Sequence, residues 1–101
     1  MQEIIKEVCL NEDGELFLLL EGEGKSSYQY IYREAVGIYW DSSAKAFKST
    51  ELKDWSCTKW FTHIVETLKN TMDLKLVLSP DVIWQNVPQL DIDDIRKLYA
   101  I

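Results

Sequence analysis

Hydrophobic residues recur with a clear helical period in residues 54–73 (DWSCTKWFTHIVETLKNTMD). If each residue turns the helix by about 100°, they fall within an arc of about 140°. They are Cys57, Trp60, Phe61, Ile64, Val65, Leu68 and Met72. Asp54 or Ser56 offers a side-chain oxygen that suits the N-cap of a helix. The pattern therefore predicts one long amphipathic helix from Asp54 to Asp73.

The residues before this helix alternate with the two-residue period of β-strands. In residues 2–10, Ile4 and Val8 are expected on one side and Ile5 on the other. Residues 16–21 (LFLLLE) are apolar on both sides, which is typical of a central strand covered on both faces. The cluster at residues 11–15 (NEDGE) contains Asp-Gly and predicts a hairpin turn between the two.

A third strand is predicted at residues 28–33 (YQYIYR), where the alternation is regular. It would place Tyr28, Tyr30 and Tyr32 on one face of the sheet. Residues 37–41 (GIYWD) and 46–50 (AFKST) are expected to form a hairpin. The half of the chain that precedes the helix is thus interpreted as a meander of short antiparallel strands.

After the helix, residues 74–78 (LKLVL) and 82–87 (VIWQNV) predict two further strands, separated by a turn at residues 79–81 (SPD). Residues 90–101 predict a short helix with Asp91 as its cap. The predicted class is α+β. It consists of an antiparallel meander of about five to six strands, one long amphipathic helix across it and a short C-terminal helix, in a single domain over residues 1–101.

Length and composition agree with one soluble domain. The chain has 101 residues, 47% of them hydrophobic, enough for a core without metal or disulfide support. No apolar run approaches the ~20 residues of a membrane span, and the N-terminal residues lack a signal-peptide layout. Cys9 and Cys57 fit two free thiols, and a cytoplasmic location is expected.

The charge narrows the range of partners. The formal net charge is −6, and both halves of the chain are net negative. Because neutralisation of phosphates by basic side chains supplies most nucleic-acid affinity, the negative charge of both halves argues against a nucleic-acid partner. A basic protein or a neutral ligand fits better, and one alternative is an acidic neutraliser of a basic toxin. Solubility alone also explains such a charge.

Aromatic residues are concentrated between Tyr28 and Phe61, where nine of the twelve lie. Such a concentration suits a cleft for a flat apolar ligand or a peptide anchor, although large rings also fill small cores. Tyr28, Tyr30, Tyr32, Trp40 and Trp55 are the candidate binding residues. Trp55 is singled out because a helical wheel turns it about 150° from the apolar stripe.

His63 is the one histidine and is the remaining candidate, expected at the edge of the helix beside Trp60 and Thr67. Imidazole can act as a base near neutral pH, but no nucleophile stands at a recognisable spacing. Cys57 falls in the apolar stripe and is expected to be buried and inert. One histidine and two distant cysteines give zinc no credible ligand set, so neither metal nor cofactor is predicted.

Three function classes remain open. The first is a non-catalytic binding or interaction module without enzymatic activity. It includes a homodimer, since the strand at residues 16–21 is apolar on both faces and the long helix covers only one. The C-terminal helix, a curled sheet or a second subunit could cover the other face. The second is a small-molecule-binding protein or weak enzyme with a pocket between sheet and helix near His63. The third is the acidic neutraliser.

Two segments carry a resemblance to a known group of proteins. The run YQYIYREAVGIYWD and the helical WFTHIV resemble small orphan proteins encoded on bacterial integron gene cassettes. The resemblance covers the middle third of the chain. It implies a bacterial cytoplasmic protein with an accessory or adaptive role, and it carries over no functional residue.

Overall fold

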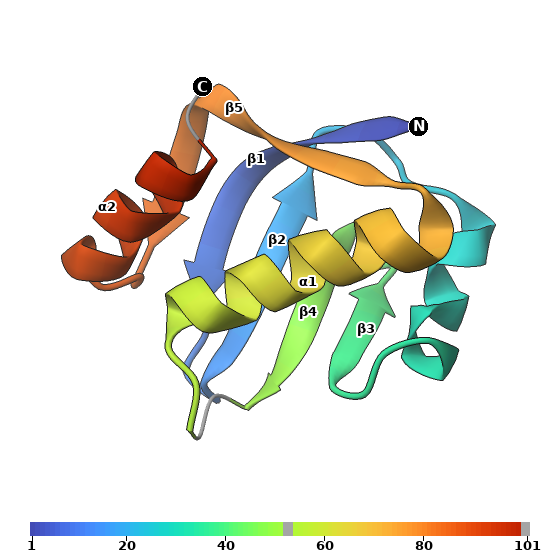
Figure 1. The fold of residues 1–101 in the computed structure, drawn as a ribbon, viewed down its shortest axis with the longest axis horizontal. Helices are drawn as coiled ribbons and strands as arrows, with labels where there is room; N and C mark the ends of the chain where they lie inside the picture. Colours follow the sequence, from blue (N-terminus) through green and yellow to red (C-terminus); the bar gives the residue numbers. More distant parts are fainter. Residues whose placement is uncertain (52–53, 100–101) are drawn as a thin grey trace.

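A five-stranded sheet forms the body of the computed structural model, which describes residues 1–51 and 54–99 (Figure 1). Along the chain the elements are β1 (Gln2–Leu10), β2 (Glu15–Leu20), the 3₁₀ helix η1 (Ser26–Arg33), β3 (Ile38–Asp41), β4 (Ala46–Glu51), α1 (Cys57–Met72), β5 (Lys75–Gln85) and α2 (Gln89–Leu98). The strand order is β3-β4-β2-β1-β5. The α+β class, the strand count and the long helix are confirmed.

The sheet is mixed, so the prediction of a purely antiparallel meander is wrong at β5. This strand runs parallel to β1, with Gln2 beside Lys75 and Cys9 beside Gln85. The pairs β1–β2, β2–β4 and β3–β4 are antiparallel. α1 carries the chain back across the sheet before β5 begins, and such a crossover makes the next strand parallel.

β5 also joins two segments that were predicted as separate strands. Its pairing with β1 jumps from Ile5 beside Leu78 to Glu7 beside Ile83. The intervening residues contain the predicted turn, in which the Asp81 amide donates to Ser79 Oγ at 3.2 Å. The local hydrogen bond of the predicted turn is therefore present. The chain does not reverse there, because the residues that follow pair with β1 in the same direction as those before.

An irregularity near Lys6 changes which side of β1 faces the core. Ile5 pairs with Leu20 and Glu7 with Leu19, so β1 holds one extra residue. Ile5 and Val8 are consequently both fully buried, whereas Ile4 is 37% exposed. The expectation that Ile4 and Val8 share a side is wrong, because a β-bulge shifts the alternation by one residue.

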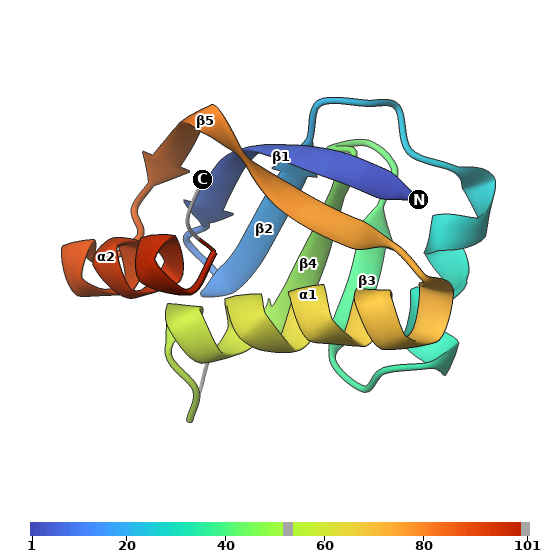
Figure 2. The ribbon, with the colours of Figure 1, turned by 45° about the horizontal axis from the view of Figure 1, so that its top comes forward.

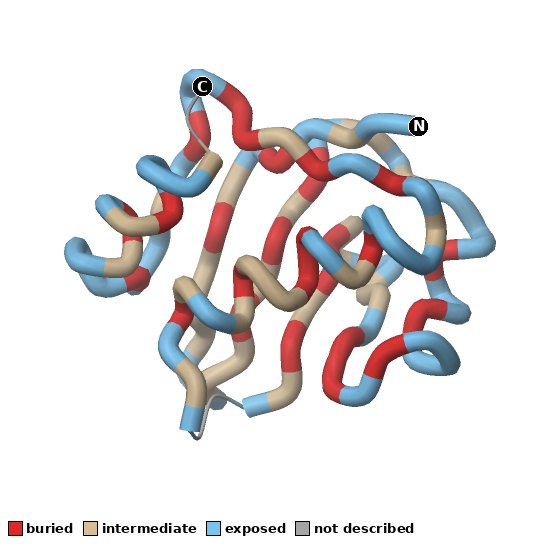
Figure 3. The backbone as a smooth tube through the Cα atoms, viewed as in Figure 1, coloured by how far each residue is buried: buried red, intermediate tan, exposed pale blue. Residues whose placement is uncertain are grey.

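α1 confirms the predicted stripe and begins within three residues of the expected start. Ser56 is its N-cap and accepts a hydrogen bond from the Lys59 amide at 3.1 Å. Asp73 ends it in the left-handed region, with φ of 51°. The residues buried against the sheet are Cys57, Phe61, Ile64, Val65 and Leu68. The burial pattern follows α1 and the inner face of the strands (Figure 3).

α2 covers the same side of the sheet as α1 (Figure 2). It begins at Gln89, and residues 100–101 of the predicted helix lie outside the described residues. Asp91 does not cap α2 as predicted. Its Oδ1 accepts from the Thr58 amide at 3.1 Å and from Thr58 Oγ1 at 2.7 Å. A carboxylate of α2 thereby satisfies the free amides at the start of α1, because the two helices meet there.

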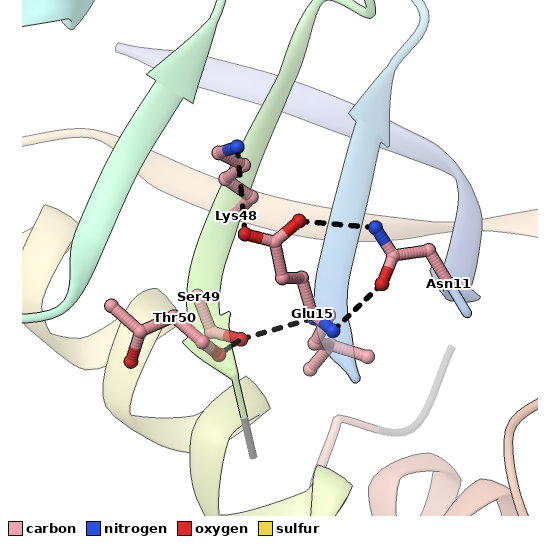
Figure 4. A network of polar contacts seen from close by, with 6 residues as sticks. Asn11, Glu15, Lys48, Ser49 and Thr50 are labelled. Atoms are coloured by element: carbon pink, nitrogen blue, oxygen red, sulfur yellow. Dashed lines mark hydrogen bonds and ion pairs between the residues drawn. The ribbon is translucent and has the colours of Figure 1, made fainter. Parts of the chain in front are cut away.

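A polar network closes the bulge between β2 and β4 (Figure 4). Ser49 is fully buried; its Oγ accepts from the Leu16 amide at 3.0 Å and donates to the Thr50 carbonyl at 2.6 Å. Glu15 binds Asn11 on one side, at 3.0 Å to Asn11 Nδ2, and Lys48 Nζ on the other at 3.7 Å. Ser49 thus gives the Leu16 amide a partner at the register shift, and the side-chain contacts of Glu15 brace the same end of β2 and β4, so the network is structural.

Candidate binding surfaces

The tyrosine segment is a 3₁₀ helix, so the prediction of a third strand at residues 28–33 is wrong. A 3₁₀ helix has three residues per turn, which puts Tyr28 and Ile31 on one side. Both are buried, whereas Tyr30 and Tyr32 are 45% and 51% exposed. The three tyrosines therefore do not share a face.

Tyr28 and Trp40 belong to a cluster in the core. The Tyr28 ring centroid lies 5.2 Å from that of Trp40 and 5.2 Å from that of Phe47. Tyr28 OH donates to Glu3 Oε2 at 2.7 Å. Burial, followed by this hydrogen bond and the charge of Glu3, raises the pKa of Tyr28 well above its usual value. Tyr28 is thus a packing residue with one satisfied hydroxyl group, and its ring does not reach the surface.

Tyr30 and Tyr32 form a small exposed group with Arg33. The guanidinium carbon of Arg33 lies 4.6 Å from the Tyr30 ring centroid and 5.7 Å from that of Tyr32. Arg33 Nε also donates to Tyr32 OH at 3.4 Å. Of the candidate binding residues in this segment, two exposed rings that share a cation therefore remain.

Trp55 and His63 lie together, with Trp60 between them in the sequence. The Trp55 and Trp60 centroids are 4.8 Å apart, and the His63 ring stands edge-on to both, at 5.2 and 5.6 Å. All three rings are half-buried. Trp55 precedes the first helical residue, so its direction is set by the chain before Ser56 and not by the helical wheel. Sequence reasoning missed Trp60 as a site residue because it belongs to the apolar stripe.

A groove of about 490 Å³ lies against these tryptophans. We call it the tryptophan groove; its described lining residues are Thr50, Glu51, Asp54, Trp55 and Trp60. Glu51 and Asp54 are exposed, and no basic residue is among the described lining residues. Two carboxylates and two tryptophans within ten positions were the sequence signal that could have located it.

The geometry around His63 and Cys57 gives no catalytic pair in the part of the chain described. The hydrogen-bond partner of His63 there is Thr67, with Nδ1 3.5 Å from Thr67 Oγ1. Cys57 is 3% exposed, and burial, reinforced by the charge of Asp91, raises the pKa of its thiol from 9.0 to about 11. The thiol therefore stays protonated near neutral pH, as expected for an inert core residue.

One face of the sheet carries apolar side chains opposite to the helices. We call it the open sheet face; its apolar members are Ile4, Cys9, Phe17, Leu19, Tyr39, Val77 and Ile83. Their neighbours in each strand are buried on the other side, under α1 and α2 (Figure 2). No described helix covers this face, which leaves the second apolar side of β2 partly exposed, as the sequence of residues 16–21 indicated.

The fold and these surfaces define a small α+β protein with accessible aromatic and apolar surfaces. Among the described residues, no helix is long and apolar enough to cross a membrane. A family model described as Integron Cassette Protein Hfx_Cass5 matches residues 7–81, which is most of the chain. The chain therefore belongs to the Hfx_Cass5 family of integron cassette proteins, and the resemblance seen in the sequence is confirmed.

One solved structure is also similar to this chain. It is described as "Structure from the mobile metagenome of North West Arm Sewage Outfall: Integron Cassette Protein Hfx_Cass5". The identity is 28%, over 100% of this chain and 98% of that chain, with a TM-score of 0.43. A search of the curated proteins finds no match. None of these comparisons names an activity or a partner.

Proposed function

We propose that the protein is a non-catalytic interaction module that forms a homodimer through the open sheet face. The single observation that carries this proposal is the apolar surface of exposed Ile83 and half-buried Phe17 and Leu19, on the side that no described helix covers. Contiguous apolar surface of this kind marks interaction sites in soluble proteins. The free thiols Cys9 and Cys57 favour a reducing compartment, and we place the protein in the cytoplasm.

The charged groups on the open sheet face bear on whether a second copy of the chain can bind there. The net charge of −6 opposes association between most parts of two copies. On the open sheet face, however, Lys48 pairs with Glu15 and lies 5.5 Å from the Phe17 ring centroid. The pair itself is neutral, and the carboxylate of Glu7, between Leu19 and Ile83, is the charge that two copies meeting there would have to hold apart.

The size of the face is also adequate. With strands about 4.8 Å apart and about 3.3 Å per residue, two faces of five strands would bury on the order of 1,000 Å². This is the lower bound for a specific interface, so we expect a dimer that dissociates on dilution. Face-to-face packing of twisted sheets is the arrangement found in β-sandwiches.

Light scattering over a wide range of concentrations tests the proposal. The wild-type mass should approach twice 11.8 kDa at high concentration. Leu19→Lys, in the middle of the open sheet face, should keep the mass at 11.8 kDa with an unchanged circular dichroism spectrum. Leu90→Lys is the matched control, because Leu90 is 73% exposed on α2. A wild-type monomer at every concentration, or a Leu19→Lys dimer, would contradict the proposal.

A second candidate function is the binding of a small molecule in the tryptophan groove. The observation that favours it is the pairing of Trp55 and Trp60 beside a groove of about 490 Å³. His63 supports the two rings from the side. We expect binding without catalysis, because the hydrogen-bond partner of His63 among the described residues is a threonine hydroxyl.

A further inference from the structure

The tryptophan groove combines two features that recognise a positively charged organic group. The indole rings of Trp55 and Trp60 form one wall, with an angle of 52° between their planes. Glu51 and Asp54 line the same groove. The face of an indole ring attracts a cation, and a carboxylate nearby balances its charge. A neutral ligand would gain only the ring contacts, and an anion would be repelled.

Trp55 already holds a cation within the chain. Lys59 Nζ lies 4.7 Å from the centroid of the Trp55 ring. Lys59 lies in the first turn of α1, where its amide donates to the Ser56 cap at 3.1 Å. This contact shows that an ammonium group can approach the ring of Trp55.

The wall of the groove is fixed by the fold. Gly37 has φ of 88°, and a Cβ atom added there would lie 2.8 Å from Trp60 Cη2. The Thr50 amide donates to the Gly37 carbonyl at 3.0 Å, which holds this backbone beside the indole. His63 packs edge-on against both tryptophans. Because the rings are ordered before a ligand arrives, little of the binding free energy is spent on ordering them.

We propose that the tryptophan groove binds a small organic cation, with an alkylammonium or quaternary ammonium group on the indole rings and the carboxylates of Glu51 and Asp54 balancing its charge. A volume of about 490 Å³ leaves room for an apolar substituent on the nitrogen. This inference rests on the second candidate function and names its ligand class. It does not depend on the homodimer, because the groove lies on the helix side of the sheet.

Choline is a suitable probe, and its neutral isostere, in which carbon replaces nitrogen, is the matched control ligand. The four tryptophans give separate indole N–H signals in proton–nitrogen NMR. At constant ionic strength, choline should shift the signals of Trp55 and Trp60 saturably and leave those of Trp40 and Trp84 unchanged. The neutral isostere should bind about tenfold more weakly, since it lacks the cation–π attraction.

Three variants and one control variant separate the contributions of rings and charges. Trp55→Leu should weaken choline binding at least about tenfold. Glu51→Gln with Asp54→Asn should weaken it about threefold to tenfold and reduce its salt dependence. Glu12→Gln with Asp13→Asn makes the same charge change in the exposed β1–β2 turn and should have little effect. Lys59→Met should strengthen binding about threefold, because it removes a like charge near the ring.

Several results would overturn the inference. These are equal affinity for choline and its neutral isostere, shifts spread over all four indoles, or wild-type affinity after loss of both Glu51 and Asp54 charges. The dispersion of the NMR signals shows whether each variant is folded. Leu19→Lys should bind choline as the wild type does. The choline result can therefore be interpreted even if the protein proves not to be a homodimer. Saturable binding of the isostere alone would retain small-molecule binding and reject the cation.

Discussion

Two clusters of three rings in this protein have nearly the same internal geometry and different surroundings. In the first cluster, Tyr28, Trp40 and Phe47, the centroids are 4.8 to 5.2 Å apart. In the second, Trp55, Trp60 and His63, they are 4.8 to 5.6 Å apart. In the first cluster Tyr28 and Phe47 are almost completely buried and Trp40 is half-buried, whereas every ring of the second cluster is half-buried.

The difference shows that ring contacts alone do not separate a core cluster from a binding surface. Tyr28 belongs to η1, which packs against β3 and thereby covers the first cluster. The second cluster stands at the start of α1, where the chain leaves the sheet, and a groove lies on one side of it. The clusters differ in how many rings are covered: in the first, Trp40 alone is half-buried, beside a smaller groove of about 320 Å³, whereas all three rings of the second retain surface that a ligand can reach.

The largest contrast is expected from removing one ring of each cluster. Tyr28→Ala should lower the free energy of unfolding by about 3–5 kcal/mol, because it leaves a cavity beside Trp40 and Phe47. Trp55→Ala should cost about 1 kcal/mol, since solvent can enter the space that it leaves. Urea unfolding measures both. Equal costs would mean that the two clusters do not differ in kind.

Each cluster has a tryptophan packed against a glycine with positive φ, and the two glycines give a second contrast. A Cβ on Gly24 would lie 2.5 Å from Trp40 Cζ2, and a Cβ on Gly37 would lie 2.8 Å from Trp60 Cη2. Gly24→Ala should cost about 2–3 kcal/mol, because Trp40 is held between two buried rings. Gly37→Ala should cost about 1–2 kcal/mol, because Trp60 can shift toward solvent.

The tryptophan fluorescence of these two variants, recorded with their thermal unfolding, checks the explanation. Gly37→Ala should alter the emission of the folded state, since Trp60 moves. Gly24→Ala should mainly lower the melting temperature. The reverse pattern would mean that the added Cβ displaces Trp40 and not Trp60, and it would contradict the comparison.

Cys57 is a buried residue at the start of α1, the helix that also carries Trp60 and His63. The titration of its thiol gives a third prediction. The pKa of the buried thiol is raised from 9.0 to about 11, so the folded state holds this proton more tightly than the unfolded chain. The stabilisation is complete below pH 9.0 and is lost as the pH rises toward about 11. Near pH 10 the loss should be about 1 kcal/mol.

Urea unfolding across this pH range measures the effect, with Cys57→Ala as the control. Other groups also titrate at high pH, so the informative quantity is the difference between the two slopes. The variant should be less stable at neutral pH because of the lost thiol volume, and it should lose less stability on going to high pH. Identical slopes would show that the thiol is accessible to water.

The smallest predicted effect concerns the hydroxyl group of the first cluster. Tyr28→Phe keeps the ring contacts with Trp40 and Phe47 and removes the 2.7 Å hydrogen bond to Glu3. We expect a cost of about 1 kcal/mol, as for one hydrogen bond of this kind. Urea unfolding of this variant beside Tyr28→Ala separates the hydroxyl from the ring. If Tyr28→Phe lowered the free energy of unfolding as much as Tyr28→Ala, the hydrogen bond and not the ring packing would account for the contribution of Tyr28.

Part of the candidate site could be predicted from the sequence. Trp55 and His63 were singled out because they depart from the stripe of the long helix, and the structure brings them together through Trp60. Glu51 and Asp54 were not recognised, since exposed carboxylates usually serve solubility. Trp60 was assigned to the core because period alone cannot show that a ring of the stripe is only half covered.

The sequence by itself determined the α+β class, the long helix with a cap at Asp54 or Ser56, and the two-sided apolarity of β2. These follow from local properties: the spacing of apolar residues, a capping oxygen and turn chemistry. The tertiary structure decided the conformation of the tyrosine segment. The alternation of Tyr28, Tyr30 and Tyr32 suits a strand, but Tyr28 packs beside Phe47 in the core, and the segment adopts a 3₁₀ helix with three residues per turn.

The tertiary structure also decided the direction of β5 and the cover of each cluster. The pairing of β5 with β1 joins residues more than seventy positions apart, and its direction depends on the path of α1 across the sheet. No local pattern encodes that path. Whether a group of rings becomes core or surface depends in the same way on which other segment packs against it, as η1 packs Tyr28 against Trp40 and Phe47.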